Sequence, residues 1–193
     1  MTPRKPEMEQ TLMKHQPSSR RGFSLVELMI VVSIIGVLAS LAAVAWGKQV
    51  RKGREVKVNQ LFASIATAQE TYRSSRGQYA GASGWTPTAV PQSVDAPFAP
   101  ADGVFAALGI NVPSQSRFAF YVQSGTPADT CGTPPAIGAA NFSAAESCDS
   151  VAAGSFYWQL FAVGDQDGDG TYSRFVLTSG MTEGVPMSVN TGE

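Results

Sequence analysis

The stretch that decides the fold is Arg20-Arg21-Gly22-Phe23-Ser24-Leu25-Val26-Glu27-Leu28-Met29-Ile30-Val31-Val32. Two basic residues and a glycine are followed at once by an apolar segment that carries one acid, Glu27. No charged side chain occurs from Leu28 to Trp46, a run of 19 residues. As a helix this run is about 28 Å long, close to the thickness of a bilayer's hydrocarbon core. A carboxylate beside such a run is costly unless it is paired, so Glu27 is a candidate functional residue.

The residues ahead of this segment, 1–22, are polar and mildly basic. An ordinary secretory signal places its apolar core before the cleavage site. Here the apolar run follows Gly22, so a cut at that glycine would leave the membrane anchor on the mature protein. The alternative is an uncleaved signal anchor, which explains neither the Gly22–Phe23 junction nor Glu27. A start at Met13 would give a ten-residue leader, so both Met1 and Met13 remain candidate starts.

This pattern resembles the N-terminal signature of type IV pilins and type II secretion pseudopilins over about residues 20–75. The resemblance implies that a membrane peptidase cuts between Gly22 and Phe23 and that Phe23 is then N-methylated. It also implies that Glu27 pairs with the N-terminal ammonium of a neighbouring subunit during assembly. The alternative for Gly22 is a linker glycine, and the alternative for Glu27 is a carboxylate that faces lipid headgroups.

The same resemblance predicts an α+β, type IV pilin-like fold, in which a long N-terminal helix packs on a small antiparallel β-sheet head. Half of that helix would be transmembrane. Four segments are expected: a cleaved leader at 1–22, the membrane or filament-core half of the helix at 23–46, its amphipathic half at 47–76, and a head with a variable loop and a sheet at 77–193.

The residues themselves support a long helix followed by strands. No proline interrupts residues 23–86. The predicted helix runs from about Phe23 to Arg76. In its second half apolar residues recur at spacings of three and four, which predicts an apolar stripe that packs on other structure or forms a coiled coil. The stripe comprises Val58, Leu61, Ile65, Ala68 and Tyr72. A loop is predicted at 77–100 and strands at 117–122, 155–163 and 172–178, the last two forming a hairpin.

Two cysteines, Cys131 and Cys148, follow the anchor. In an oxidising compartment we expect them to form one disulfide, which would contribute about 3 kcal/mol in the chain-entropy model. The sole histidine, His15, lies in the expected leader, and this excludes every histidine-based catalytic arrangement from the mature chain. A membrane-tethered enzyme is therefore the weakest functional alternative.

Three aspartates, Asp165, Asp167 and Asp169, alternate with other residues before Gly170 and resemble the start of a calcium loop. The twelfth position of such a loop is Val176, where an EF-hand needs a glutamate, so the loop is not a complete EF-hand. Its oxygen ligands could still hold Ca²⁺ with backbone carbonyls and water. The alternative is a hairpin turn in which Asp-Gly pairs supply positive φ angles. No other cofactor is expected.

Without residues 1–22 the chain would carry nine basic and thirteen acidic residues, and nucleic acid is not an expected partner. Five of the nine basic residues lie together after the apolar run: Lys48, Arg51, Lys52, Arg54 and Lys57. Their candidate partners are lipid phosphates, acidic groups of neighbouring subunits and, least favoured, DNA.

We therefore predict a structural subunit, major or minor, of a type IV pilus-like filament, with a type II secretion pseudopilin as the alternative. Expected partners are other pilin subunits, a prepilin peptidase, an inner-membrane assembly platform and membrane lipid before assembly. The expected location is a single pass through the inner membrane with the C-terminal domain in the periplasm, and then the pilus at the cell surface. The basic leader favours a cytoplasmic N terminus.

Overall fold

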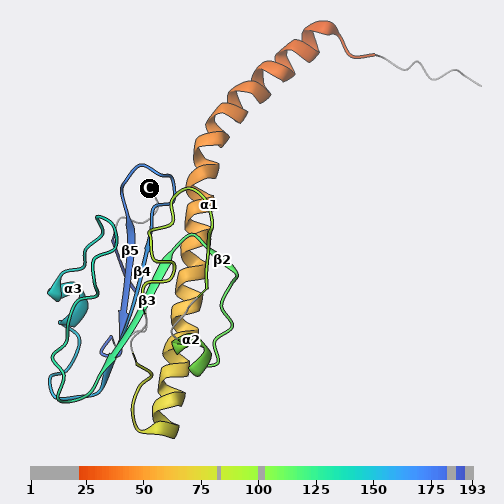
Figure 1. Ribbon diagram of the computed structural model, residues 1–193. Helices are drawn as coiled ribbons and strands as arrows, with labels where there is room; N and C mark the ends of the chain where they lie inside the picture. The colour runs from red at the N-terminus through yellow and green to blue at the C-terminus, as the bar shows by residue number, and fades with distance from the viewer. Residues whose placement is uncertain (1–21, 82–83, 100–102, 182–185, 190–193) are drawn as a thin grey trace, which may run out of the picture. The chain divides into compact units, whose positions relative to one another are not determined.

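The computed structural model of the protein describes residues 22–81, 84–99, 103–181 and 186–189 (Figure 1). The chain divides into two compact units, Met1–Ala42 and Ala43–Glu193. A single helix, α1 (Leu25–Arg76), contributes to both units. It begins two residues after the predicted Phe23 and ends at the predicted Arg76. The expected leader, including Met13 and His15, lies outside the described residues except for Gly22.

Local chemistry explains where α1 ends. Arg73 and Arg76 occupy its last turn, where cations stabilise the negative end of the helix dipole. Gly77 follows with φ of 77°, a left-handed conformation that glycine adopts without steric cost. Its N–H donates to the Arg73 carbonyl at 2.8 Å, which satisfies one of the free acceptors at the helix end.

The second unit contains a four-stranded antiparallel sheet of order β3-β4-β5-β6. Its strands are β3 (Ala119–Gly125), β4 (Tyr157–Gly164), β5 (Ser173–Thr178) and β6 (Met187–Val189). The three strands predicted from the sequence are confirmed as β3, β4 and β5, with β3 displaced by two to three residues. The predicted hairpin is confirmed as well, because β4 and β5 pair from Gln159 with Thr178 to Gly164 with Ser173.

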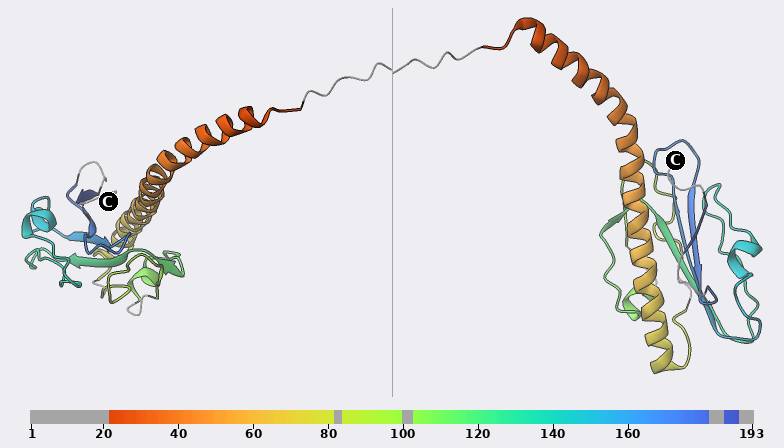
Figure 2. Two further views of the ribbon diagram at one scale, coloured as in Figure 1. Left: turned by 90° about the horizontal axis from the view of Figure 1, so that it is seen from above. Right: turned by 180° about the vertical axis from the view of Figure 1, so that it is seen from behind.

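One face of this sheet packs on the C-terminal part of α1, as the views in Figure 1 and Figure 2 also show. Alternate residues of each strand point to this face, because side chains alternate along a strand. Phe62 of α1 lies edge-on to Phe120 of β3, with ring centroids 6.2 Å apart. Trp158, Leu160 and Leu177 belong to the same apolar cluster.

The helix face that packs on the sheet overlaps the predicted stripe only in part. Among the described side chains of α1 the fully buried ones are Val58, Phe62, Ile65 and Gln69, whereas Leu61, Ala68 and Tyr72 of the predicted stripe are half-buried. The prediction is thus confirmed at Val58 and Ile65, and the centre of the buried face is displaced from the predicted stripe by roughly 50° around the helix. Gln69 is buried because its side chain pairs with the backbone of Ala80: Oε1 accepts from the amide at 2.9 Å and Nε2 donates to the carbonyl at 3.4 Å.

The opposite face of the sheet is covered by the connection between β3 and β4, which contains the short helix α3 (Ala144–Cys148). Phe142 from this connection packs on Phe161 of β4, with ring centroids 5.0 Å apart. Because both faces are covered, all eight residues of β4 are buried. This explains why the sequence of β4 is a nearly continuous apolar run.

Small elements fill the segment between α1 and β3. They are β1 (Ala96–Pro97) and β2 (Gln115–Ser116), which pair with each other, and the helix α2 (Val104–Ala107). The loop predicted at 77–100 therefore includes one two-residue strand. Phe98 beside β1 and Phe105 of α2 pack edge-on, with centroids 5.6 Å apart, and both join the cluster that faces α1.

Candidate functional site

The junction between Gly22 and Phe23 lies directly ahead of α1. Both residues are exposed, Phe23 to 81%. Ser24 then starts the helix: its hydroxyl accepts from the Val26 amide at 3.3 Å, and its carbonyl accepts from the Leu28 amide at 3.1 Å. The side chain thus satisfies one of the free amides at the helix N terminus. The peptide bond at this junction is accessible and stands outside the hydrogen-bonded helix.

Glu27 occupies the first turn of α1. A carboxylate is stabilised there by the positive end of the helix dipole. Among the described residues its side chain makes no hydrogen bond or ion pair, and it is exposed. An acid that borders an apolar segment in this way requires a partner when it leaves water. If the chain begins at Phe23, the new ammonium group stands four residues before Glu27 and is a cation of the required kind.

The apolar surface that follows is extensive. Within the described residues α1 is the one helix that is long and apolar enough to cross a membrane. None of the side chains from Leu25 to Ala43 is buried. The large ones include Leu28, Met29, Ile34, Leu38 and Leu41, all more than half exposed. Apolar side chains so exposed require a lipid bilayer or other apolar helices around them.

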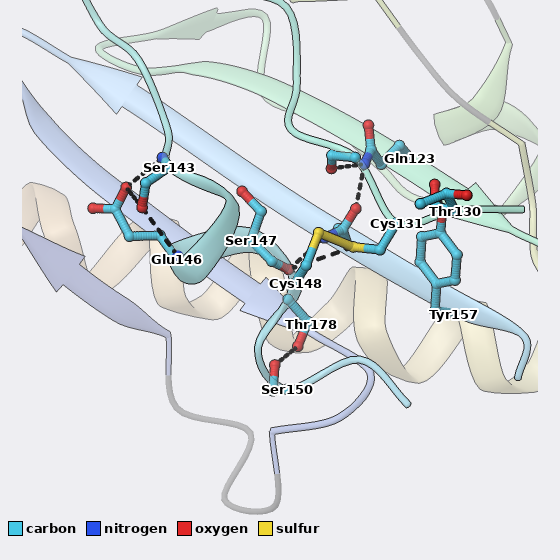
Figure 3. Close-up of a disulfide and its surroundings, with 12 residues drawn as sticks. Gln123, Thr130, Cys131, Ser143, Glu146, Ser147, Cys148, Ser150, Tyr157 and Thr178 are labelled. Carbon is cyan, nitrogen blue, oxygen red and sulfur yellow. Dashed lines mark hydrogen bonds between the residues drawn. A yellow bond between two sulfur atoms is a disulfide. The ribbon is translucent and has the colours of Figure 1, made fainter. Parts of the chain in front are cut away.

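The cysteines of the second unit are joined. Cys131 and Cys148 form a disulfide with a Cα–Cα distance of 5.9 Å (Figure 3). The bridge closes the connection between β3 and β4 and ends α3 at Cys148. At the other end of α3, Ser143 and Glu146 form a capping box, in which each side chain accepts from the other residue's backbone amide (Figure 3).

Two glutamines that the sequence did not single out hold the disulfide loop on the sheet. Gln159 of β4 is fully buried, and its Nε2 donates to the Ser147 carbonyl and lies 3.2 Å from Cys131 Sγ. Gln123 of β3 donates to Gln159 Oε1 and, at 2.7 Å, to the Gly132 carbonyl. Gln159 lies in the middle of an otherwise apolar strand, and this polar interruption was the signal available in the sequence.

The aspartate cluster lies in the turn between β4 and β5. One carboxylate oxygen of each of Asp165, Asp167 and Asp169 lies within 4.8 Å of the others. Asp165 is almost fully buried and accepts from the amides of Gly168 at 2.7 Å and Gly170 at 3.1 Å. Both glycines have positive φ angles, of 82° and 87°. These contacts are those of an aspartate-stabilised turn, as the turn alternative predicted.

Two contacts of this turn compete with metal binding. Asp167 forms an ion pair with Arg51 of α1, with 3.6 Å between Nη1 and Oδ2. Asp169 Oδ1 accepts from the Thr171 amide at 2.6 Å. The donor set fits a hard cation, which prefers carboxylate oxygens, although Arg51 already neutralises part of the negative charge.

The structure thus brings together two of the predicted sets of residues, the cysteines and the aspartates. Both lie in the second unit, whereas Gly22, Phe23 and Glu27 lie in the first. The N-terminal set differs from the other two in having exposed side chains without partners among the described residues.

Comparison with known proteins points to the same N-terminal region. The sequence model for the prokaryotic N-terminal methylation motif matches residues 17–43. A type IV major pilin protein, PilA of Myxococcus xanthus (strain DK1622), is 37% identical over 59 residues, which cover 31% of this chain and 27% of PilA. The type IV major alpha-pilin of Moraxella bovis is 39% identical over 51 residues, covering 26% of this chain and 32% of the relative.

A third relative, fimbrial protein Q of Moraxella bovis, has the same identity over a region of the same length. The chain therefore spans about a third or less of each relative that it matches. No solved structure matches the chain.

Proposed function

Because the chain belongs to the type IV pilin family, as its prepilin-type methylation motif and pilin relatives show, we propose that it is a structural subunit of a type IV pilus-like filament. The observation that carries this proposal is the start of α1. An accessible Gly22–Phe23 junction, a Glu27 without a partner among the described residues, and a long exposed apolar surface occur there in one continuous segment. Each feature is a requirement of a subunit that is stored in a membrane and then polymerised.

Processing is the first step of this function. A prepilin peptidase cuts after Gly22, where the absence of a side chain lets the enzyme approach the backbone closely. Phe23 becomes the N-terminal residue and is methylated. The membrane-length part of α1 stays on the mature chain, because the cut precedes it.

Assembly uses the charge that processing creates. The ammonium of Phe23 needs an anionic partner once it is surrounded by apolar helices, and Glu27 of a neighbouring subunit supplies it. This pairing fixes the register in which a new subunit docks. The partners are thus other pilin subunits, together with an inner-membrane assembly platform.

The single pass through the inner membrane places residues after Trp46 in the periplasm before assembly. The head, at 77–193, then forms the filament surface. This function needs no cofactor and no catalytic residue. Calcium binding by the aspartate turn would be an additional property of the head, and its test is separate from that of assembly.

A type II secretion pseudopilin is the alternative within the same family, because it shares the N-terminal processing and helix. A chromosomal deletion separates the two. Loss of surface pili and twitching with normal protein secretion supports the pilin, whereas loss of secretion with normal pili rejects it in favour of the pseudopilin.

Complementation of the deletion tests the role of Glu27. We expect Glu27→Ala to be processed normally but to be missing from sheared filaments. The matched control is Asp149→Ala, which removes an exposed acid of the head and should restore filaments. Normal incorporation of the Glu27→Ala chain would reject the proposed pairing.

A further inference from the structure

A small basic pocket lies beside α1 in the second unit, outside every site described above. Its volume is about 240 Å³. Arg54 and Lys57 of α1 line it together with Asp95, Arg117, and Gln115 and Ser116 of β2. A water occupies about 30 Å³, so the pocket has room for a tetrahedral oxyanion and several waters.

The charges in this pocket are unbalanced. Its one acid, Asp95, is paired with Arg117, whose Nε lies 2.6 Å from Asp95 Oδ1. The side chains of Arg54 and Lys57 form no hydrogen bond or ion pair with any described residue. Three cations thus face one carboxylate, and two of them have unused donors.

The electrostatics of Arg54 reflect this excess. Burial lowers the pKa of the Arg54 guanidinium, and the positive charges of Arg117 and Arg51 lower it further against the opposing effect of Asp95. The surroundings therefore disfavour this cation unless an anion joins it. A bound anion would relieve the repulsion, and an arginine offers several donors in a planar fork that matches a phosphate.

The pocket lies close to the end of the membrane-length segment. Trp46 is 73% exposed, and tryptophan is enriched where a membrane meets water. Arg54 follows it by eight residues, or about 12 Å along the helix. The headgroup layer is about 5–8 Å deep on each side of the hydrocarbon core. Long cationic side chains extend toward that layer, so lipid phosphates come within reach of Arg54 and Lys57.

We propose that this pocket, formed by Arg54, Lys57 and Arg117, binds the phosphate of an anionic membrane lipid while the chain is anchored in the bilayer. The inference rests on the membrane-anchored state under the proposed function, but not on filament assembly. The lipid would hold the head against the membrane surface, and it must leave the pocket when the subunit enters a filament.

Native mass spectrometry of the full chain in detergent tests the pocket. The chain is mixed with phosphatidylglycerol and phosphatidylcholine of identical acyl chains, and retained lipid is counted. We expect one phosphatidylglycerol per chain, retained in preference to phosphatidylcholine. Each cation near an anionic lipid contributes a factor of about five, so R54Q/K57Q should weaken retention roughly 30-fold.

The matched control is K48Q/K52Q, which makes the same change in charge at two exposed residues of α1 that do not line the pocket. Because these two lysines do not line the pocket, we expect the control to lose clearly less bound lipid than R54Q/K57Q in detergent. The charge-keeping pair R54K/K57R should retain the lipid. This result would show that the loss in R54Q/K57Q comes from the missing charges and not from structural damage at these positions.

Four results would overturn the proposal. Two concern the lipid itself: equal losses of lipid in the two glutamine pairs, and no preference for phosphatidylglycerol in the native chain. Two concern competitors: displacement of the lipid by a short DNA duplex that itself stays bound, and efficient displacement by inorganic phosphate alone, which would indicate a site for the free ion. Filament incorporation of the same variants is measured in parallel, so failure here is distinguishable from failure of the assembly proposal.

Discussion

Trp158 of β4 donates its indole N–H to Glu70 of α1, with 3.0 Å between Nε1 and Oε1. Glu70 Oε1 also accepts from the hydroxyl of Tyr79 at 2.9 Å. One carboxylate thus joins the helix, the segment just after it and the central strand of the sheet. Burial raises the pKa of the Tyr79 phenol, so this hydroxyl keeps its proton and remains a donor throughout the neutral range.

This contact leads to a prediction about stability. Trp158→Phe keeps an aromatic ring but removes the donor, and a hydrogen bond to a charged group contributes about 1.5–3 kcal/mol. Because Glu70 is exposed, we expect a loss of about 1–2 kcal/mol in the free energy of unfolding. Urea unfolding of the full chain in detergent measures it. Trp85→Phe is the comparison, since Trp85 donates to the uncharged Pro135 carbonyl at 2.7 Å. A larger loss in that variant would contradict the role given to Glu70.

Gln159 provides a second test, at the disulfide loop. Gln159→Leu preserves the size of the side chain but leaves the Ser147 carbonyl and the Gln123 amide without their buried partner. We expect a loss of about 1–3 kcal/mol in unfolding free energy, with the disulfide still formed. Gln78→Leu, an exposed change of the same kind, should be nearly neutral. Equal stability of the two variants would show that the glutamine network does not hold the loop.

Acidification should weaken the capping box at Glu146. Burial acts to raise the pKa of its carboxyl, but hydrogen bonds from the Ser143 amide and hydroxyl and the charge of Arg174 outweigh it and lower the pKa below the ordinary 4.5. The stabilisation is therefore present above pH 4.5 and is lost as the pH falls through the folded-state pKa.

The variant Glu146→Gln tests this pH dependence. Glutamine keeps the capping geometry, so stability at pH 7 should change by less than about 1 kcal/mol. Unfolding free energies measured from pH 7 down to pH 3 should fall less steeply for this variant than for the native chain. An identical fall in unfolding free energy for both chains would refute the assignment to Glu146. Ser143→Ala, which removes the hydroxyl but keeps the charge of Glu146, should also make the fall with pH less steep.

The aspartate turn allows a prediction that separates its structure from calcium. Asp165→Ala removes the acceptor for two amides, so we expect the free energy of unfolding to fall by about 1–3 kcal/mol in buffer that contains a calcium chelator. Asp169→Ala removes one exposed hydrogen bond and should lower the free energy of unfolding by less. Calcium titration of the native chain by calorimetry accompanies these measurements. Heat at millimolar calcium that Asp165→Ala abolishes would establish a metal site, and no heat would leave the turn as the whole role of the cluster.

The long helix and the three main strands were predictable from the sequence because their patterns are long. The helix lacks proline, and β4 and β5 are apolar runs on either side of a turn rich in Asp and Gly. The buried face of α1 was not predictable in the same way. Leu61 and Phe62 are adjacent and both apolar, so periodicity alone places the stripe only to within one residue.

The features that could not be predicted depend mostly on contacts between residues that are distant in sequence. Gln69 is buried because the Ala80 backbone, eleven residues away, satisfies its amide. Gln159 is buried through Ser147 and Gln123. The elements β1, β2 and β6 have only two or three residues, too few for any periodicity. The pocket at Arg54 depends on Arg117, which lies 63 positions further along the chain, so no local pattern indicates it.

Processing and assembly together are best tested by intact-mass spectrometry of protein from sheared surface filaments and, separately, from membranes. If the chain is processed and assembled as proposed, the filament species begins at methylated Phe23 and lacks the two hydrogens lost in the Cys131–Cys148 bridge. A mass that includes residues 1–22 in every fraction would show that the chain is not processed at Gly22.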